Sequence, residues 1–196
     1  MMARQFSGTA TGSCAIAFAT ALMVGCSSAA PGSTAQSQSP VERGKYLVTI
    51  GGCNDCHTPK TLGPNGPVPD TSKLLSGHPE SMKMPPAPQL PPQGPWAITI
   101  SPDLTAWSGP WGVSFPANLT PDRNTGLGIW TEDMFIKAIR TGKHMGTSRD
   151  ILPPMPWQQY SQMTDDDLKA IFAYLRSIPP VVNHVPDPIP PAAAAK

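Results

Sequence analysis

The segment Cys53-Asn54-Asp55-Cys56-His57 constrains this 196-residue chain more than any other feature. Within one turn of helix, two thiols at this spacing can form thioethers with the two vinyl groups of a single porphyrin, and the histidine that follows is carried under the iron. The porphyrin then offers a broad apolar surface against which the chain can fold. The pattern therefore predicts one covalent c-type haem, attached through Cys53 and Cys56, with His57 as an axial ligand of the iron.

Other interpretations of two neighbouring cysteines fit this segment less well. A thioredoxin-like redox pair belongs in a βαβ context and needs no histidine. A structural zinc site needs a second pair of ligands at similar spacing. The chain has 4 cysteines, and the other two, Cys14 and Cys26, lie near its N-terminus. Haem attachment is the interpretation that the whole pattern favours.

Residues 1–25 have the layout of a secretory signal peptide, with one charge at Arg4 and then a run of small and apolar residues. The run ends in Leu22-Met23-Val24-Gly25-Cys26, which resembles a bacterial lipoprotein box, where the signal is removed and the cysteine carries a diacylglycerol. An ordinary signal peptide cleaved nearby is the alternative. Since each buried methylene contributes about 0.8 kcal/mol, several acyl chains would anchor the protein stably. We therefore expect export to the periplasm and a membrane anchor at Cys26.

Composition limits the classes of function and divides the chain. The formal net charge is +1 and falls to about zero without residues 1–25, so no basic field is left to attract nucleic acid. Residues 26–40 are rich in Ser, Ala, Gly, Gln and Pro, which is typical of a flexible tether. Residues 41–186 are then expected to form one mono-haem domain, and residues 187–196 a disordered tail.

Three helices are predicted, each from a capping residue that precedes apolar residues at helical spacing. Their expected N-caps are Ser39, Thr131 and Thr164. The first helix would run to Ile50, the second would end at Gly142 and the third before Pro179. Gly44 inside the first helix costs about 1 kcal/mol relative to alanine. Close approach of another helix would explain its presence, and the alternative is that Gly44 is incidental.

Residues 58–121 are predicted to be an irregular insertion. They hold 15 of the 26 prolines, and proline is excluded from helix interiors. Large apolar side chains in this stretch argue for burial against the porphyrin rather than for disorder. These side chains are Trp96, Trp107, Trp111 and Phe115. The run 96–100 fits a short strand.

The second axial ligand decides between electron transfer, for which both axial positions are filled, and chemistry at an open position. Met155 is the strongest candidate, because prolines on both sides restrict its backbone and would present the thioether rigidly. The alternative is that Met155 only packs, as most methionines do. His144 is the second choice. The remaining candidates are Met82, Met84, Met145, Met163 and His78.

Further contacts are expected around the haem. His57 is expected to donate its other ring proton to an acceptor that fixes its orientation, and a carbonyl within residues 62–67 is the candidate. Trp130 and Arg140 are candidates for hydrogen bonds to the haem propionates.

Further motifs accompany the haem motif in a characteristic order. They are Arg43-Gly44-Lys45-Tyr46-Leu47-Val48, Asn118-Leu119-Thr120-Pro121-Asp122, Thr125-Gly126-Leu127-Gly128, Trp130-Thr131, and residues 152–157 and 164–180. Over roughly residues 41–186 the chain resembles class I c-type cytochromes, specifically the cytochrome subunits and domains that serve periplasmic alcohol and aldehyde dehydrogenases.

The resemblance implies a mainly α cytochrome c fold, with three or more helices around one covalent haem and a long Pro/Gly/Trp-rich insertion. It implies thioethers at Cys53 and Cys56, and His57 and Met155 on the iron. It also implies an electron carrier rather than an enzyme, with a dehydrogenase as donor and a respiratory-chain component as acceptor. The single Cys-x-x-Cys-His motif indicates one haem. A gas sensor or a peroxidase-like enzyme, with an open or labile sixth position, is the alternative.

Overall fold

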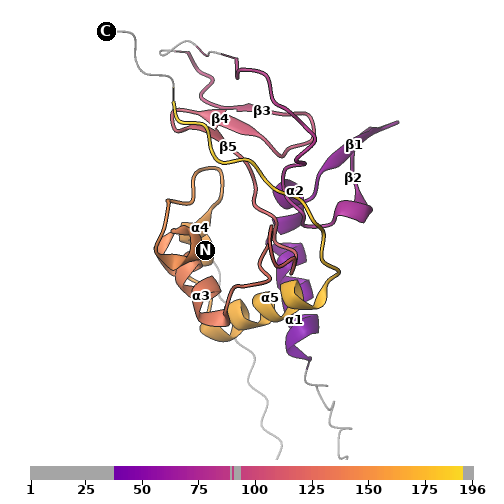
Figure 1. The fold of residues 1–196 in the computed structure, drawn as a ribbon, viewed down its shortest axis with the longest axis vertical. Helices are drawn as coiled ribbons and strands as arrows, with labels where there is room; N and C mark the ends of the chain where they lie inside the picture. Colours follow the sequence, from indigo (N-terminus) through magenta and orange to yellow (C-terminus); the bar gives the residue numbers. More distant parts are fainter. Residues whose placement is uncertain (1–37, 89, 91–93, 192–196) are drawn as a thin grey trace, which may run out of the picture. The chain divides into compact units, whose positions relative to one another are not determined.

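The computed structural model describes residues 38–88, 90 and 94–191. The predicted signal peptide, Cys26 and most of the tether lie outside the described residues. The described part contains five α-helices, two 3-10 helices and two small antiparallel sheets (Figure 1). The shorter helices are α2 (Cys53–His57), α4 (Trp157–Tyr160), η1 (Thr71–Lys73) and η2 (His144–Gly146). Within these ranges, none of the helices combines the length and apolar character needed to cross a membrane.

The three longer helices confirm the prediction. They are α1 (Pro40–Ile50), α3 (Glu132–Thr141) and α5 (Asp165–Ser177). Each predicted N-cap accepts a backbone hydrogen bond through its side-chain oxygen, which satisfies a donor that the first turn leaves free. Glu42 completes a capping box with Ser39 in α1. Gly142 ends α3 at φ +66°, a left-handed conformation that glycine adopts without strain.

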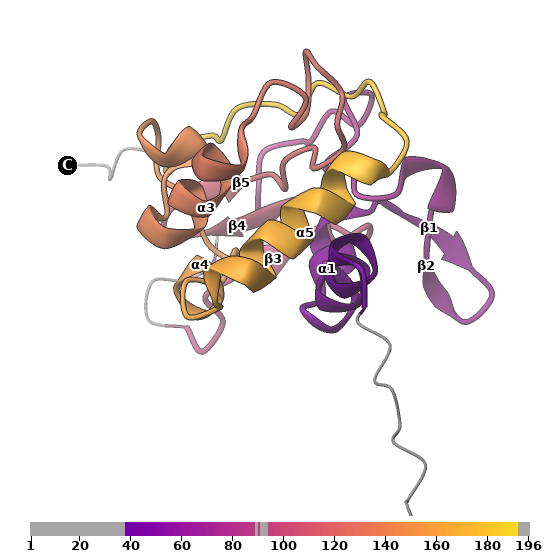
Figure 2. The same cartoon turned by 90° about the horizontal axis from the view of Figure 1, so that it is seen from below.

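Helices α1 and α5 cross in close contact (Figure 2). Gly44 lies at the crossing, where a Cβ atom would stand 1.9 Å from the carbonyl oxygen of Ala170 in α5. No side chain larger than hydrogen fits between these backbones. The predicted reason for Gly44, close approach of another helix, is therefore confirmed.

The apolar faces of α1, α3 and α5 enclose the core. Its buried members include Leu47, Val48, Phe135, Ile139, Leu168, Ile171, Phe172 and Leu175. The rings of Phe135 and Phe172 stack with their centroids 5.3 Å apart, which joins α3 to α5. Cys53 and Met155 are half-buried against the same cluster. Two segments far apart in the sequence therefore meet at one core.

The insertion is less irregular than the sequence predicts. Its strands are β1 (Lys60–Gly63), β2 (Gly66–Pro69), β3 (Thr99–Ile100), β4 (Trp107–Gly109) and β5 (Gly112–Ser114). The first two form a hairpin, and the last three form a sheet in the order β3-β4-β5. With 33% of the described residues in helices and 13% in strands, the fold is not clearly mainly helical. Strands of two to four residues are too short to show the alternation by which strands are predicted.

The aromatic side chains of the insertion differ in burial. Trp107, Trp111 and Phe115 are half-buried, as large apolar groups prefer. Trp107 donates from its ring nitrogen to the carbonyl of Leu104 at 2.9 Å. Trp96, by contrast, is 75% exposed, so no contact within the described part of the chain buries it, and its burial against the porphyrin stays a prediction.

The C-terminal segment pairs with β5 instead of fraying from residue 187. The backbone N–H groups and carbonyls of Val113 and Ile189 exchange two hydrogen bonds of 2.8 and 2.9 Å. A Cβ atom on Gly112 would stand 2.0 Å from the Ile189 carbonyl, so the two backbones touch there. This pairing corrects the predicted tail as far as residue 191, and residues 192–196 lie outside the described part.

Candidate haem site

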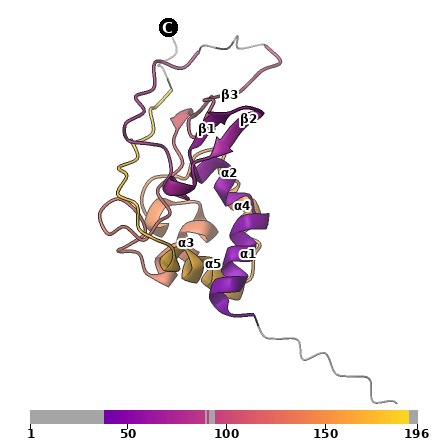
Figure 3. The same ribbon diagram turned by 90° about the vertical axis from the view of Figure 1, so that its right-hand side faces the viewer.

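Helix α2 contains the whole Cys-x-x-Cys-His motif and follows directly on α1 (Figure 3). Gly52 separates the two helices in a left-handed conformation, with φ +68°. Both cysteines are free and half-buried. Burial raises the pKa of Cys53 to about 11, so this thiol is protonated near neutral pH. The two thiols lie less than one helical turn apart.

The imidazole of His57 is buried, with 8% of its surface exposed. Its Nδ1 lies 2.8 Å from the backbone carbonyl oxygen of Ala117. Because a carbonyl only accepts, Nδ1 carries the proton and Nε2 keeps a free lone pair. Burial lowers the pKa of His57, and the hydrogen bond to Ala117 opposes that shift. The neutral ring is thus oriented with Nε2 available to a metal.

The partner of His57 is a backbone carbonyl, as the sequence predicts. Its predicted location, within residues 62–67, is wrong. Residues 62–67 form the end of the β1–β2 hairpin, where Leu62 is 90% exposed. That turn extends into solvent and cannot serve a buried ring. The sequence gives no signal for Ala117, because a backbone acceptor has no side-chain signature.

Backbone hydrogen bonds from Gly77 and His78 hold the segment that carries the Ala117 carbonyl in place. Gly77 N–H donates to the His57 carbonyl at 2.7 Å, and His78 N–H donates to the Pro116 carbonyl at 3.0 Å. Gly77 has φ +79°, and a Cβ atom there would lie 2.7 Å from the Ala117 oxygen. The backbone at Gly77 therefore lies between the haem motif and the acceptor of the His57 proton.

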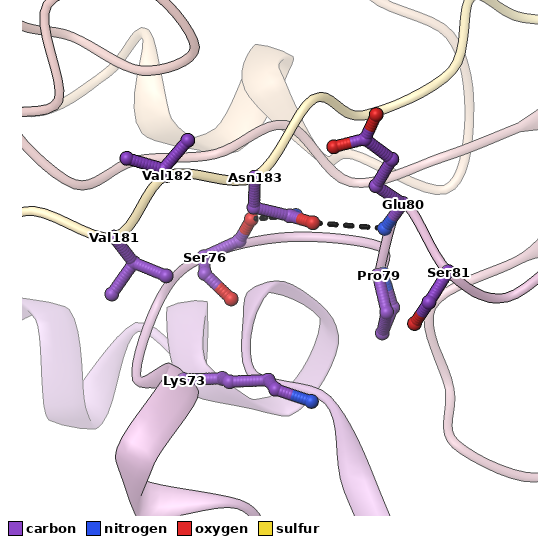
Figure 4. Close-up of a pocket in the computed structure, with 8 residues that line it drawn as sticks. All are labelled: Lys73, Ser76, Pro79, Glu80, Ser81, Val181, Val182 and Asn183. Carbon is purple, nitrogen blue, oxygen red and sulfur yellow. Dashed lines mark hydrogen bonds between the residues drawn. The ribbon is translucent and has the colours of Figure 1, made fainter.

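Asn183, in the C-terminal part of the chain, holds the segment that contains Gly77 and His78 (Figure 4). Its side-chain amide donates to the carbonyls of Ser76 and His78 at 2.7 and 2.8 Å, and its oxygen accepts from Glu80 N–H at 2.8 Å. An open hollow of about 330 Å³ lies beside it. The hydroxyl of Ser76 lines this hollow and, among the described residues, has no hydrogen-bond partner.

Met155 lies on a loop that is held at several points. Ile151 N–H donates to the Gly142 carbonyl at 2.7 Å, and the Ser114 hydroxyl donates to the Pro153 carbonyl. Just beyond the loop, the Tyr160 hydroxyl donates to the Gly51 carbonyl, next to the haem motif. Hydrogen bonds thus fix the methionine loop to α3, to β5 and to the start of the motif.

The two histidines among the competing ligand candidates, His78 and His144, have other partners. His78 is fully buried, and both of its ring nitrogens are hydrogen-bonded, to Thr105 and to the Met82 carbonyl. The His144 ring meets Trp130 edge to face at 5.1 Å. Arg140, a candidate for the propionates, donates instead to the Ser161 carbonyl and to Asp165.

The side chains present fit a covalently bound haem. Two free thiols on one short helix suit two thioethers. The neutral His57 ring, with its proton fixed on Nδ1, suits an iron ligand. In the described part of the chain, no group of three or more His, Cys, Asp or Glu side chains is close enough to hold a metal ion.

Comparisons with known proteins find cytochrome subunits of dehydrogenases. No family model matches the chain. Three similar proteins are the gluconate 2-dehydrogenase cytochrome c subunit of Pantoea cypripedii, the fructose dehydrogenase cytochrome subunit of Gluconobacter japonicus, and the quinone alcohol dehydrogenase cytochrome c subunit of Gluconobacter oxydans. The identities are 30% over 145 residues, 28% over 135 and 26% over 150.

The aligned regions cover 73%, 69% and 75% of this chain, but 24%, 20% and 24% of the relatives. The chain thus spans a quarter or less of the length of these relatives. Over most of its length the chain is similar to the c-type cytochromes of these dehydrogenase subunits, which confirms the resemblance drawn from its motifs. These three relatives are electron-carrying cytochrome subunits of dehydrogenases and not catalytic subunits.

Proposed function

We propose that this chain is an exported cytochrome that carries electrons through one covalently bound haem c. Cys53 and Cys56 would hold the haem through thioethers, and His57 and Met155 would be the axial ligands. The observation that carries this proposal is the buried His57 ring, whose Nδ1 proton is committed to Ala117 while Nε2 stays free. When bound, the haem supplies reversible exchange of one electron at its iron.

Met155 is proposed as the second ligand because its loop is both restrained and half-buried. The loop is tied to β5 through Ser114 and to the haem motif through Tyr160. Met155 itself packs against the core cluster that Cys53 also contacts. A thioether ligand favours ferrous over ferric iron and so raises the reduction potential.

The proposed partners follow from the relatives. Their names make them cytochrome subunits of dehydrogenases, so a dehydrogenase is the proposed donor. A respiratory-chain component is proposed as the acceptor on the resemblance of the motifs alone. The proposed location is the periplasm, with a signal peptide in residues 1–25, a lipid anchor on Cys26 and a tether before the haem domain of residues 41–186. The near-neutral charge gives no reason to propose nucleic acid as a partner.

The test is an absorption spectrum of the oxidised protein after haem attachment, repeated after reduction and exposure to carbon monoxide. We expect a low-spin spectrum with a weak methionine-to-iron charge-transfer band, no reaction with carbon monoxide, and one haem per chain. Met155→Ala should open the iron to carbon monoxide. The control is Met163→Leu, at a half-buried methionine nearby in the sequence, which should leave the iron closed to carbon monoxide. A high-spin wild-type spectrum would contradict the proposal and favour gas sensing or peroxide chemistry.

A further inference from the structure

We propose that His78, Thr105 and Asp103 act together as positioning residues for His57. In this inference their hydrogen-bonded chain fixes the Ala117 carbonyl, and so sets the strength of its bond to His57 and the reduction potential of the iron. It rests on the proposed function, because it requires His57 to bind the iron.

The three side chains form a buried chain of hydrogen bonds. Thr105 and His78 are completely buried, and Asp103 is 5% exposed. The Thr105 hydroxyl lies between the other two, 2.9 Å from Nδ1 of His78 and in hydrogen-bond contact with one Asp103 oxygen. Ser101 donates its hydroxyl to the other oxygen of Asp103. At its far end, Nε2 of His78 lies 3.0 Å from the Met82 carbonyl oxygen.

The direction of these bonds follows from what each group can do. Although burial acts to raise it, hydrogen bonds from Ser101 and Thr105 lower the pKa of Asp103, which is therefore an acceptor. Thr105 has one hydroxyl proton and donates it to this carboxylate. Nδ1 of His78 is hydrogen-bonded to Thr105, and Nε2 is hydrogen-bonded to the Met82 carbonyl. Both ring nitrogens are thus fixed, so the ring has one orientation.

The oriented His78 is connected to His57 along two routes. The His78 ring contacts the ring of Phe115, with centroids 4.7 Å apart. The backbone N–H of His78 donates to the Pro116 carbonyl. These residues directly precede Ala117. On the other side, Gly77 directly precedes His78 and donates to the backbone carbonyl of His57. A displaced His78 would move the acceptor of the His57 proton and the backbone beside it.

The expected effect on the iron has a definite sign. A hydrogen bond from Nδ1 to a fixed carbonyl makes Nε2 a stronger electron donor, which favours ferric iron and lowers the potential. Loosening the Ala117 carbonyl weakens that bond. The potential should therefore rise when the chain of three residues is interrupted, even though none of them would touch the iron.

The test compares Thr105→Val, which keeps the shape of the side chain and removes the hydroxyl, with Thr105→Ser, which keeps the hydroxyl. We expect Thr105→Val to raise the midpoint potential and to speed solvent exchange of the His57 Nδ1 proton, measured by nuclear magnetic resonance in the reduced protein. Thr105→Ser should keep both properties close to wild type. His184→Gln, at an exposed histidine, is the surface control.

A second interruption, Asp103→Asn, covers the case in which Thr105→Val does not fold. Folded Thr105→Val or Asp103→Asn protein with the wild-type potential and exchange rate would overturn the inference. Failure of the proposed function looks different, because the wild-type protein would then lack a histidine-ligated, low-spin iron before any variant is made.

Discussion

Tyr160 donates a hydrogen bond to the backbone carbonyl of Gly51, which lies 109 positions earlier in the sequence. Gly51 is two residues before Cys53, and Tyr160 ends α4, five residues after Met155. A Cβ atom on Gly51 would lie 3.7 Å from the Tyr160 ring and 3.8 Å from the Cys53 sulfur. Burial raises the pKa of Tyr160, which keeps the hydroxyl protonated as a donor. This contact joins the methionine loop to the haem motif.

Tyr160→Phe should therefore weaken both the fold and the sixth ligand. Removal of one net hydrogen bond costs about 1 kcal/mol of unfolding free energy, measured in denaturant. If Met155 is the ligand, the ferrous variant should also react with carbon monoxide faster than wild type. Tyr46→Phe, at a tyrosine that is 50% exposed, is the control. Equal free energies of unfolding for the two variants would show that the contact to Gly51 is not stabilising.

Gly44→Ala should destabilise the protein, although the same change usually stabilises a helix by about 1 kcal/mol. The new methyl group would meet the Ala170 carbonyl and force α1 and α5 apart. Overpacking of this kind costs about 1–3 kcal/mol. Thermal unfolding should show a lower melting temperature for Gly44→Ala and little change for Lys45→Ala, the exposed neighbour. A stabilised Gly44→Ala protein would contradict the close crossing.

Gly77→Ala should disturb the orientation of His57. Its Cβ would lie within 2.7 Å of the Ala117 carbonyl, and its φ of +79° is strained for any other residue. Gly66→Ala is a matched control, since Gly66 also has a positive φ, +119°, but nothing lies within 4 Å of its Cβ position. Backbone strain of about 1–3 kcal/mol is common to both. Only Gly77→Ala should alter the ring-proton resonance of His57, and similar spectra of the two variants would contradict this.

Asp103 should make the protein sensitive to acid. Its folded pKa lies below the ordinary value of 3.8, because hydrogen bonds from Ser101 and Thr105 outweigh burial. A group with a lowered folded pKa contributes stability above its unfolded pKa and loses it as pH falls through the folded value. Unfolding in urea from pH 7 to pH 3 should thus show a steeper loss for wild type than for Asp103→Asn. Asp150→Asn, at an exposed position, should keep the wild-type slope.

Local features of this protein could be predicted because they act within a few residues. The N-caps Ser39, Thr131 and Thr164 satisfy donors in the next turn, so each helix start is encoded where it occurs. The Cys53–His57 spacing likewise carries its chemistry within a single helical turn. Gly44 indicated a close crossing, although the sequence did not indicate that α5 is the partner.

By itself, the sequence determined the positions of the three long helices and the haem motif. The tertiary structure alone decided which carbonyl orients His57, how the insertion pairs into two sheets, and that Ile189 joins β5. These features depend on backbone groups, which are the same in almost every residue and so leave no mark in the sequence. Strands of two to four residues are ordered by partners far along the chain, and only folding brings those partners together.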